Sequence, residues 1–143
     1  EHGLKLMHMP QDLDAAFREF IPPFGAAGNP VDITGGEPPS TYQNTIKLGL
    51  EDDRIHALIL GYWHTIITPP MVFARLAVET IAQAKEKGIH KPIVASLVGD
   101  VEVEEAAEYL YDHGIVAYPY RMELPVAVLG AKYTWARGAG ALS

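Results

Sequence analysis

The apolar run at residues 57–62, Ala-Leu-Ile-Leu-Gly-Tyr, constrains the fold of this chain more than any other segment. Such near-continuous runs are typical of strands that are buried on both faces, as in parallel sheets. Thr68 followed by Pro69-Pro70 then resembles a helix start, with an N-cap and proline at the first helical position. A helix is therefore expected over 68–87, and a buried strand followed by a helix predicts a parallel α/β unit.

The same order of elements recurs along the chain. Helices are predicted over 11–21, 40–50, 68–87, 102–112 and 124–135, and strands over 31–34, 57–62, 92–98 and 115–118. This alternation predicts a flavodoxin-like, doubly wound parallel sheet in three α/β/α layers, folded as a single domain. We expect an N-terminal helix and lead-in loop over 1–28, the flavodoxin-like domain over 29–135, and a linker over 136–143.

Composition narrows the class of partner and the compartment. The net charge of −7 and the pI near 5.2 argue against nucleic acid or an anionic membrane as the main partner. Cysteine is absent, which excludes disulfides and is compatible with a cytoplasmic location. No apolar run reaches the roughly 18 residues of a transmembrane helix. Because the chain does not begin with methionine, we expect it to be a piece of a longer protein.

The stretch at 29–36, Asn-Pro-Val-Asp-Ile-Thr-Gly-Gly, combines an extended entry with a glycine turn. The alternation of Val31 and Ile33 with polar residues predicts a short strand. Gly35 and Gly36 are then expected to adopt backbone conformations that residues with a Cβ avoid. Such a turn either brings main-chain N–H groups close to a ligand or is only a tight connection. Asp32 either bonds neighbouring loop amides or points into a site.

Ligands of parallel sheets bind beyond the carboxyl ends of the strands. The helix start near Thr68 lies at this edge, and its unpaired N–H groups and dipole would attract an anion such as phosphate. His64 lies there too, with either a packing role or a ligand-facing role. The histidines show no ligand spacing on one helix face, so no metal site is predicted. Asp100 is expected to start the following helix.

Three segments, in this order, resemble those of one protein family. They are Asn-Pro-Val-Asp-Ile-Thr-Gly-Gly at 29–36, the run 57–62 leading into Thr68-Pro69-Pro70, and Lys-Pro-Ile-Val-Ala-Ser at 91–96 leading to Gly99. Over nearly its whole length the chain resembles the NDP-forming acyl-CoA synthetases (acetate–CoA ligase, ADP-forming), relatives of succinyl-CoA synthetase. It looks like the second flavodoxin-like CoA-ligase domain of that family.

The resemblance implies a reaction in which carboxylate, CoA and ATP give acyl-CoA, ADP and phosphate through an acyl phosphate and a phosphohistidine. In the relatives, helix N-termini hold the phosphohistidine, and the helix after this domain's second strand supplies one of them. The matching positions, and so the implied contacts, are Trp63, His64, Thr65, Thr68, Pro70 and Met71. Asn29, Asp32, Gly35 and Gly36 match the family's strand-loop signature at the same edge.

The chain also departs from the family in ways that limit its own role. The family's Ser-His-Thr-Gly-Ala-like phosphohistidine loop is absent, so none of the six histidines inherits that role. The resemblance therefore implies an inactive isolated domain with no catalytic residue or cofactor of its own. CoA, ATP or ADP and Mg would be used by the complete enzyme. The implied partners are sister CoA-binding, phosphohistidine and ATP-grasp domains or subunits.

Other functions stay open at this point. Gly99-Asp100 and Met122-Glu123-Leu124 differ from the family's usual residues, and a related protein acetyltransferase family shares these domains. A stand-alone receiver-like module is an alternative, since Asp100 ends a strand, but the segment 118–120 offers no lysine. A flavin-binding module is another, although the loop 35–39 is poor in serine and threonine.

Overall fold

One parallel sheet organises the structure, a computed structural model that describes residues 2–141. Its strands are β1 (Leu58–Trp63), β2 (Ile93–Val98) and β3 (Val116–Pro119), in the order β1-β2-β3. Leu58 pairs with Ile93 and Val94 with Val116, and both pairings are parallel. All three strands therefore end at the same edge, here called the carboxyl edge.

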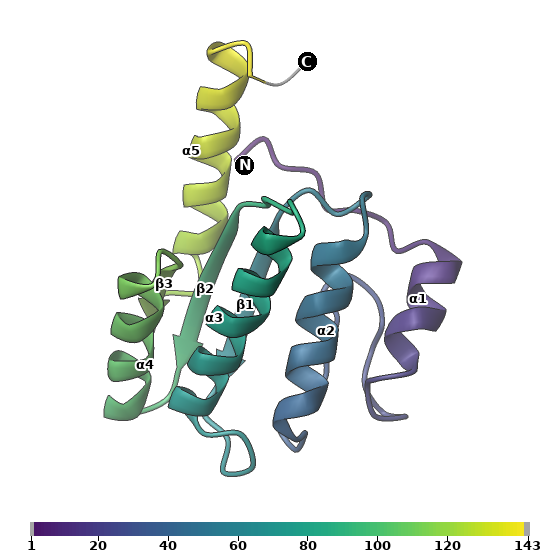
Figure 1. Ribbon diagram of the computed structural model, residues 1–143, viewed down its shortest axis with the longest axis vertical. Coiled ribbons are helices and arrows are strands. Elements are labelled where there is room, and N and C mark those ends of the chain that lie inside the picture. The colour runs from purple at the N-terminus through teal and green to yellow at the C-terminus, as the bar shows by residue number, and fades with distance from the viewer. Residues whose placement is uncertain (1, 142–143) are drawn as a thin grey trace.

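Helices lie on both faces of this sheet. They are α1 (Gln11–Arg18), α2 (Pro39–Glu51), α3 (Pro70–Glu86), α4 (Val101–Asp112) and α5 (Leu124–Gly138). Helices α2, α3 and α4 stand side by side on one face and begin at the carboxyl edge, which is the lower edge in Figure 1. Helix α5 contacts β2 and β3. The predicted α/β class, with a parallel sheet between helices, is confirmed.

The main core lies between the sheet and the helices α2, α3 and α4. Leu60 of β1 and Leu97 of β2 are buried in it together with residues of these helices. Side chains alternate along a strand, so the neighbouring residues face the other way. On that side Ser96 is fully buried and contacts Met122, just before α5, whereas Ile59 and Trp63 are exposed. The outer face of β1 is therefore open.

The strand predicted at 31–34 does not form, so this prediction was wrong. Asp32 instead makes a single antiparallel bridge with Ala26, with N–O distances of 2.7 and 2.9 Å in the two directions. Alternation of apolar and polar residues is a local signal, whereas a strand also needs a neighbour with which to pair. The segment is held by packing instead, since Ile33 contacts the main core.

A second, smaller apolar cluster lies around α1. It consists of Leu13, Phe17, Ile21 and Ala27, and we call it the N-terminal cluster. Arg54 connects this part to the end of α2, because its guanidinium donates two hydrogen bonds to Asp12 at 3.0 and 2.9 Å and two to Asp52 at 2.9 and 2.6 Å. Helix α1 is thus attached to the side of α2 by its own apolar contacts and by one arginine.

Most predicted helices end within three residues of the observed bounds. Helix α5 extends to Gly138, so residues 136–138 are helical rather than part of a linker. Residues 142–143 of the predicted linker lie outside the described residues, and the domain boundary after residue 28 stays a prediction. Within 2–141, no helix has the length and hydropathy needed to cross a bilayer.

Candidate functional site

Helix α3 begins at the carboxyl edge with two main-chain N–H groups that lack an acceptor within the described residues. The N-cap is Pro69 rather than the expected Thr68, and Pro70 follows it, so neither proline donates a hydrogen bond. The Phe73 N–H donates to the Pro69 carbonyl at 3.0 Å, which leaves the N–H groups of Met71 and Val72 unpaired. The first turn also has no acidic residue. This helix end is therefore suited to an anion.

The loop before α3 is fixed by Thr68, whose side chain is fully buried. Its hydroxyl donates to the Glu37 carbonyl at 2.8 Å. Its own carbonyl accepts hydrogen bonds from the Tyr62 phenol at 2.7 Å and from the Thr65 hydroxyl at 3.1 Å. Burial raises the pKa of Tyr62, which keeps the phenol protonated as a donor. The polar groups of Thr68 thus position the start of α3.

Three aromatic rings hold the first turn of α3 against its neighbours. Tyr62 of β1 stacks on Phe73 of α3, with ring centroids 4.5 Å apart and planes 20° from parallel. Tyr42 of α2 meets Phe73 edge-on at 5.7 Å. Such pairs stabilise by about 0.5–1.5 kcal/mol beyond their buried area. Since Phe73 follows Val72 directly, these contacts orient the two unpaired N–H groups.

The segment 29–36 lies against this loop, although its geometry differs from the prediction. The Asp32 carboxylate accepts a hydrogen bond from the Thr34 N–H at 2.8 Å, so of its two open roles it has the loop-bonding one. Thr34 has a positive φ of 63°, whereas Gly35 and Gly36 do not, and the expected glycine conformations were wrong. An Asx turn of this kind stabilises the local bend without glycine.

Gly35 brings this segment to the β1–α3 loop. A Cβ at Gly35 would lie 3.5 Å from the Thr65 methyl carbon, and Glu37 accepts the Thr68 hydrogen bond described above. Asn29, the first signature residue, instead contacts the N-terminal segment, because its side-chain amide donates to the Met7 carbonyl at 3.1 Å. Gly35 therefore lies beside the loop that leads into α3, and the signature role that the resemblance implies for Asn29, Asp32, Gly35 and Gly36 stays a prediction.

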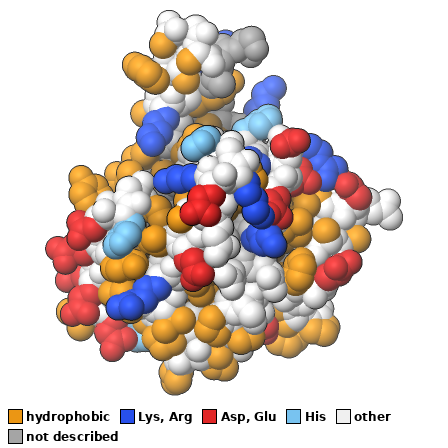
Figure 2. Space-filling view, in the orientation of Figure 1, with side chains coloured by type: hydrophobic (Ala, Val, Ile, Leu, Met, Phe, Trp, Pro, Cys, Tyr) orange, Lys and Arg blue, Asp and Glu red, His pale blue; other side chains and the backbone are white. Residues whose placement is uncertain are grey.

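Exposed apolar side chains lie along the carboxyl edge, where α3 begins. Figure 2 shows hydrophobic side chains gathered along the lower edge, where the helices α2 and α3 begin. Ile66 is 95% exposed, and Trp63, Ile67 and Val72 are also exposed, whereas Met71 is half-buried against the main core. We call these four exposed residues the apolar rim. An exposed apolar surface of this kind is typical of a protein interface.

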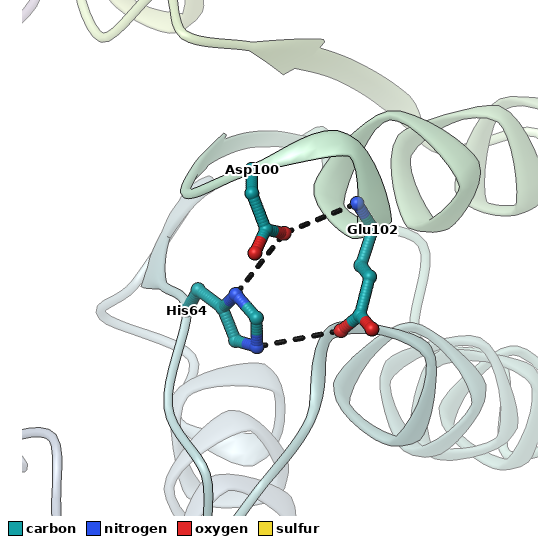
Figure 3. A group of neighbouring side chains, drawn as sticks. All are labelled: His64, Asp100 and Glu102. Carbon is teal, nitrogen blue, oxygen red and sulfur yellow. Dashed lines mark hydrogen bonds and ion pairs between the residues drawn. The ribbon is translucent and has the colours of Figure 1, made fainter.

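His64 lies at the same edge, at the end of β1, and faces the start of α4 (Figure 3). Its Nδ1 is 3.2 Å from Asp100 Oδ1, and its Nε2 is 3.4 Å from Glu102 Oε2. Asp100 is the N-cap of α4 and accepts a hydrogen bond from the Glu102 N–H at 3.2 Å, which confirms its expected role. A Cβ at Gly99 would lie 2.6 Å from the His64 Cβ, so the ring needs glycine beside it.

The contact between His64 and Asp100 was not predicted from the sequence. The order of the strands could have indicated it, because His64 follows β1 and Asp100 lies two residues beyond β2. Carboxyl ends of paired parallel strands lie at one edge, which brings together residues that are 36 positions apart.

Comparisons with known proteins place the whole chain in one group. A family model described as Ligase-CoA domain matches residues 1–143. The alpha subunit of ADP-forming acetate–CoA ligase I of Pyrococcus furiosus is 34% identical over 137 residues, which is 96% of this chain and 29% of the relative. The alpha subunit of ligase II from the same organism is 31% identical, over 93% of this chain and 28% of that relative.

Solved structures of relatives have the same fold. Dinucleotide-forming acetyl-coenzyme A synthetase 1 of Ca. Korarchaeum cryptofilum, in its apo form, matches with a TM-score of 0.85 and 34% identity, over 95% of this chain and 29% of that one. The same enzyme in complex with phosphate and ADP matches with a TM-score of 0.84, over 95% of this chain and 28% of that one. This chain thus spans less than a third of the length of its curated relatives.

Proposed function

This chain belongs to the Ligase-CoA domain family, and from that premise we propose that it is one domain of an ADP-forming acyl-CoA synthetase. The complete enzyme would convert carboxylate, CoA and ATP into acyl-CoA, ADP and phosphate. CoA, the nucleotide and Mg would bind outside this domain, and a cytoplasmic location stays a prediction. The isolated domain is expected to be inactive.

The role assigned to this domain is to hold a phosphohistidine supplied by a sister domain. The observation that carries the proposal is the pair of unpaired N–H groups, of Met71 and Val72, at a helix start without acidic residues. Such a helix end stabilises a phosphoryl group through hydrogen bonds and the helix dipole. A related enzyme has been solved with phosphate and ADP, two compounds of the proposed reaction.

The apolar rim supports docking of sister domains at this edge. Ile66 and Ile67 in the loop before α3, and Trp63 at the end of β1, are large apolar side chains left in solvent at the same edge of the sheet. Burying them against a partner would also exclude water from the site, which strengthens electrostatic interactions there. We propose that the CoA-binding, phosphohistidine and ATP-grasp domains of the longer protein or its partner subunits provide this cover.

The test is a Val72→Glu substitution in the complete enzyme. Val72 is 40% exposed and lies at the third position of α3, so the new carboxylate fits sterically but occupies the anion site. Two unit charges about 4 Å apart repel by about 1–4 kcal/mol. Histidine phosphorylation from ATP should therefore fall by at least about fivefold. Thermal unfolding should stay unchanged or move upward, since an acidic residue stabilises a helix N-terminus.

Val126→Glu is the matched control. Val126 is 37% exposed and lies at the third position of α5, whose first turn likewise has no acidic residue. We expect this variant to retain phosphorylation. Equal phosphorylation in the Val72→Glu variant and the wild type would contradict the proposed role of α3.

A further inference from the structure

The imidazole of His64, held between two carboxylates, is a second chemically distinctive feature of the carboxyl edge (Figure 3). No lysine or arginine within residues 2–141 forms an ion pair with Asp100 or Glu102. The single O–H of the nearby Tyr120 phenol is shared between the Asp100 main-chain carbonyl at 2.9 Å and the Glu104 carboxylate at 3.1 Å. It therefore neutralises neither carboxylate of the group.

The two ring nitrogens of His64 face different carboxylates. Nδ1 lies 3.2 Å from Asp100 Oδ1, and Nε2 lies 3.4 Å from Glu102 Oε2. In the tautomer that has its proton on Nδ1, the Nε2 lone pair faces the Glu102 carboxylate. A cation between these two acceptors would bind both. We propose that His64 Nε2 and Glu102 Oε2 bind a divalent cation of the zinc type, with Asp100 as the group that orients the imidazole.

The distances fit this assignment. Donors about 2.0–2.2 Å from a tetrahedral zinc ion are about 3.4 Å apart, which is the separation of Nε2 and Oε2. One donor atom from each of the three residues lies within 4.8 Å of the others, so the two proposed ligands and the orienting carboxylate form one compact group. Imidazole together with carboxylate favours zinc and its neighbours over magnesium.

The surroundings of the group fit as well. A carboxylate that accepts the other ring N–H is the usual support of a metal-binding histidine. The side chains of Asp100 and Glu102 are each 60% exposed, which leaves open positions on the ion for water. The sequence predicted no metal site because these residues share no helix face. They come together only because β1 and β2 are paired in the sheet. The inference is independent of the function proposed above.

Binding of Zn²⁺ to the 143-residue chain tests the proposal, by calorimetric titration with zinc chloride in a non-coordinating buffer. We expect one saturable site. His64→Gln and Glu102→Gln should each abolish it, and Asp100→Asn, which retains a capping oxygen, should weaken it by about 10–100-fold. His113→Gln and Glu105→Gln are matched controls outside the group and should bind as the wild type does.

NMR of the histidine ring nitrogens distinguishes a metal from a proton at the same place. At saturating Zn²⁺ we expect a coordinated Nε2 and a proton that stays on Nδ1 of His64. Protons on both nitrogens at saturating Zn²⁺ would show an imidazolium ion pair and overturn the proposal. Wild-type binding by the His64→Gln/Glu102→Gln double variant would overturn it as well. Thermal unfolding of each variant checks that it is folded.

Discussion

Replacing Thr68 by valine removes one hydroxyl from a fully buried side chain at the start of α3 and changes its shape little. The Glu37 carbonyl, which accepts its only hydrogen bond within the described residues from this hydroxyl, then loses its partner. Leaving this part-buried carbonyl without its partner costs about 1–3 kcal/mol. The free energy of unfolding should fall by that amount.

The expected change in melting temperature follows from the chain length. At about 2.1 cal/mol/K per residue, 143 residues have an unfolding entropy of about 0.3 kcal/mol/K. A loss of about 1–3 kcal/mol should therefore lower the melting temperature by about 3–10 °C, measured by circular dichroism or calorimetry.

Thr80→Val is the matched control. The Thr80 hydroxyl is also buried and donates at 2.7 Å, but to the Leu76 carbonyl within α3. That carbonyl also accepts the helical hydrogen bond from the Thr80 N–H, so it keeps a partner in the variant. We expect the melting temperature to change by less than about 3 °C. Equal melting temperatures for the two variants would refute the structural role assigned to the Thr68 hydroxyl.

Substitutions at three further positions give measurable outcomes. The Arg54 guanidinium lowers the pKa of Asp52 from 3.8 to about 2, so their contact stabilises the fold above about pH 4 and this stabilisation is lost as the pH falls towards 2. The melting-temperature difference between wild type and Arg54→Gln should accordingly shrink over that pH range; a constant difference would contradict this. Gly99→Ala places a Cβ 2.6 Å from the His64 Cβ, so the free energy of unfolding measured in urea should fall by about 1–3 kcal/mol. A variant as stable as the wild type would show that this loop relaxes freely. Asp100→Ala should cost about 1 kcal/mol through loss of the α4 cap, and Asp100→Asn a few tenths, so a similar cost for both would exclude the capping explanation.

The elements with strong local signals were predictable from the sequence. The strand 57–62 and the proline-rich start of α3 were found within two residues, because a near-continuous apolar run and proline at a helix start are visible locally. The expected burial of this strand on both faces was wrong, since Ile59 and Trp63 are exposed. The strand predicted at 31–34 was wrong because pairing depends on a neighbour that no local pattern reveals. The positive φ at Thr34 escaped prediction for a related reason, since the carboxylate of Asp32 stabilises that turn.

The candidate site was predictable in position but only partly in detail. The order of the elements alone predicts that the loop after β1 lies at the carboxyl edge. The burial of Thr68 and its hydrogen bond to Glu37 could not be predicted, because they depend on a tertiary contact between two loops 31 residues apart. Direct contact of Met71, His64 and the other implied residues with a phosphohistidine stays a prediction, and the Val72→Glu experiment tests the helix start that they share.

The N-terminal cluster has a consequence for how this protein opens. Leu13, Phe17 and Ile21 pack around their own centre, apart from the main core that supports the sheet. Parts of a protein with separate apolar centres can exchange their amide hydrogens through separate local openings. We expect the amides of α1 to exchange faster than those of β2. A protease would then find its first cleavage sites near α1, and the trimmed remainder would keep its sheet.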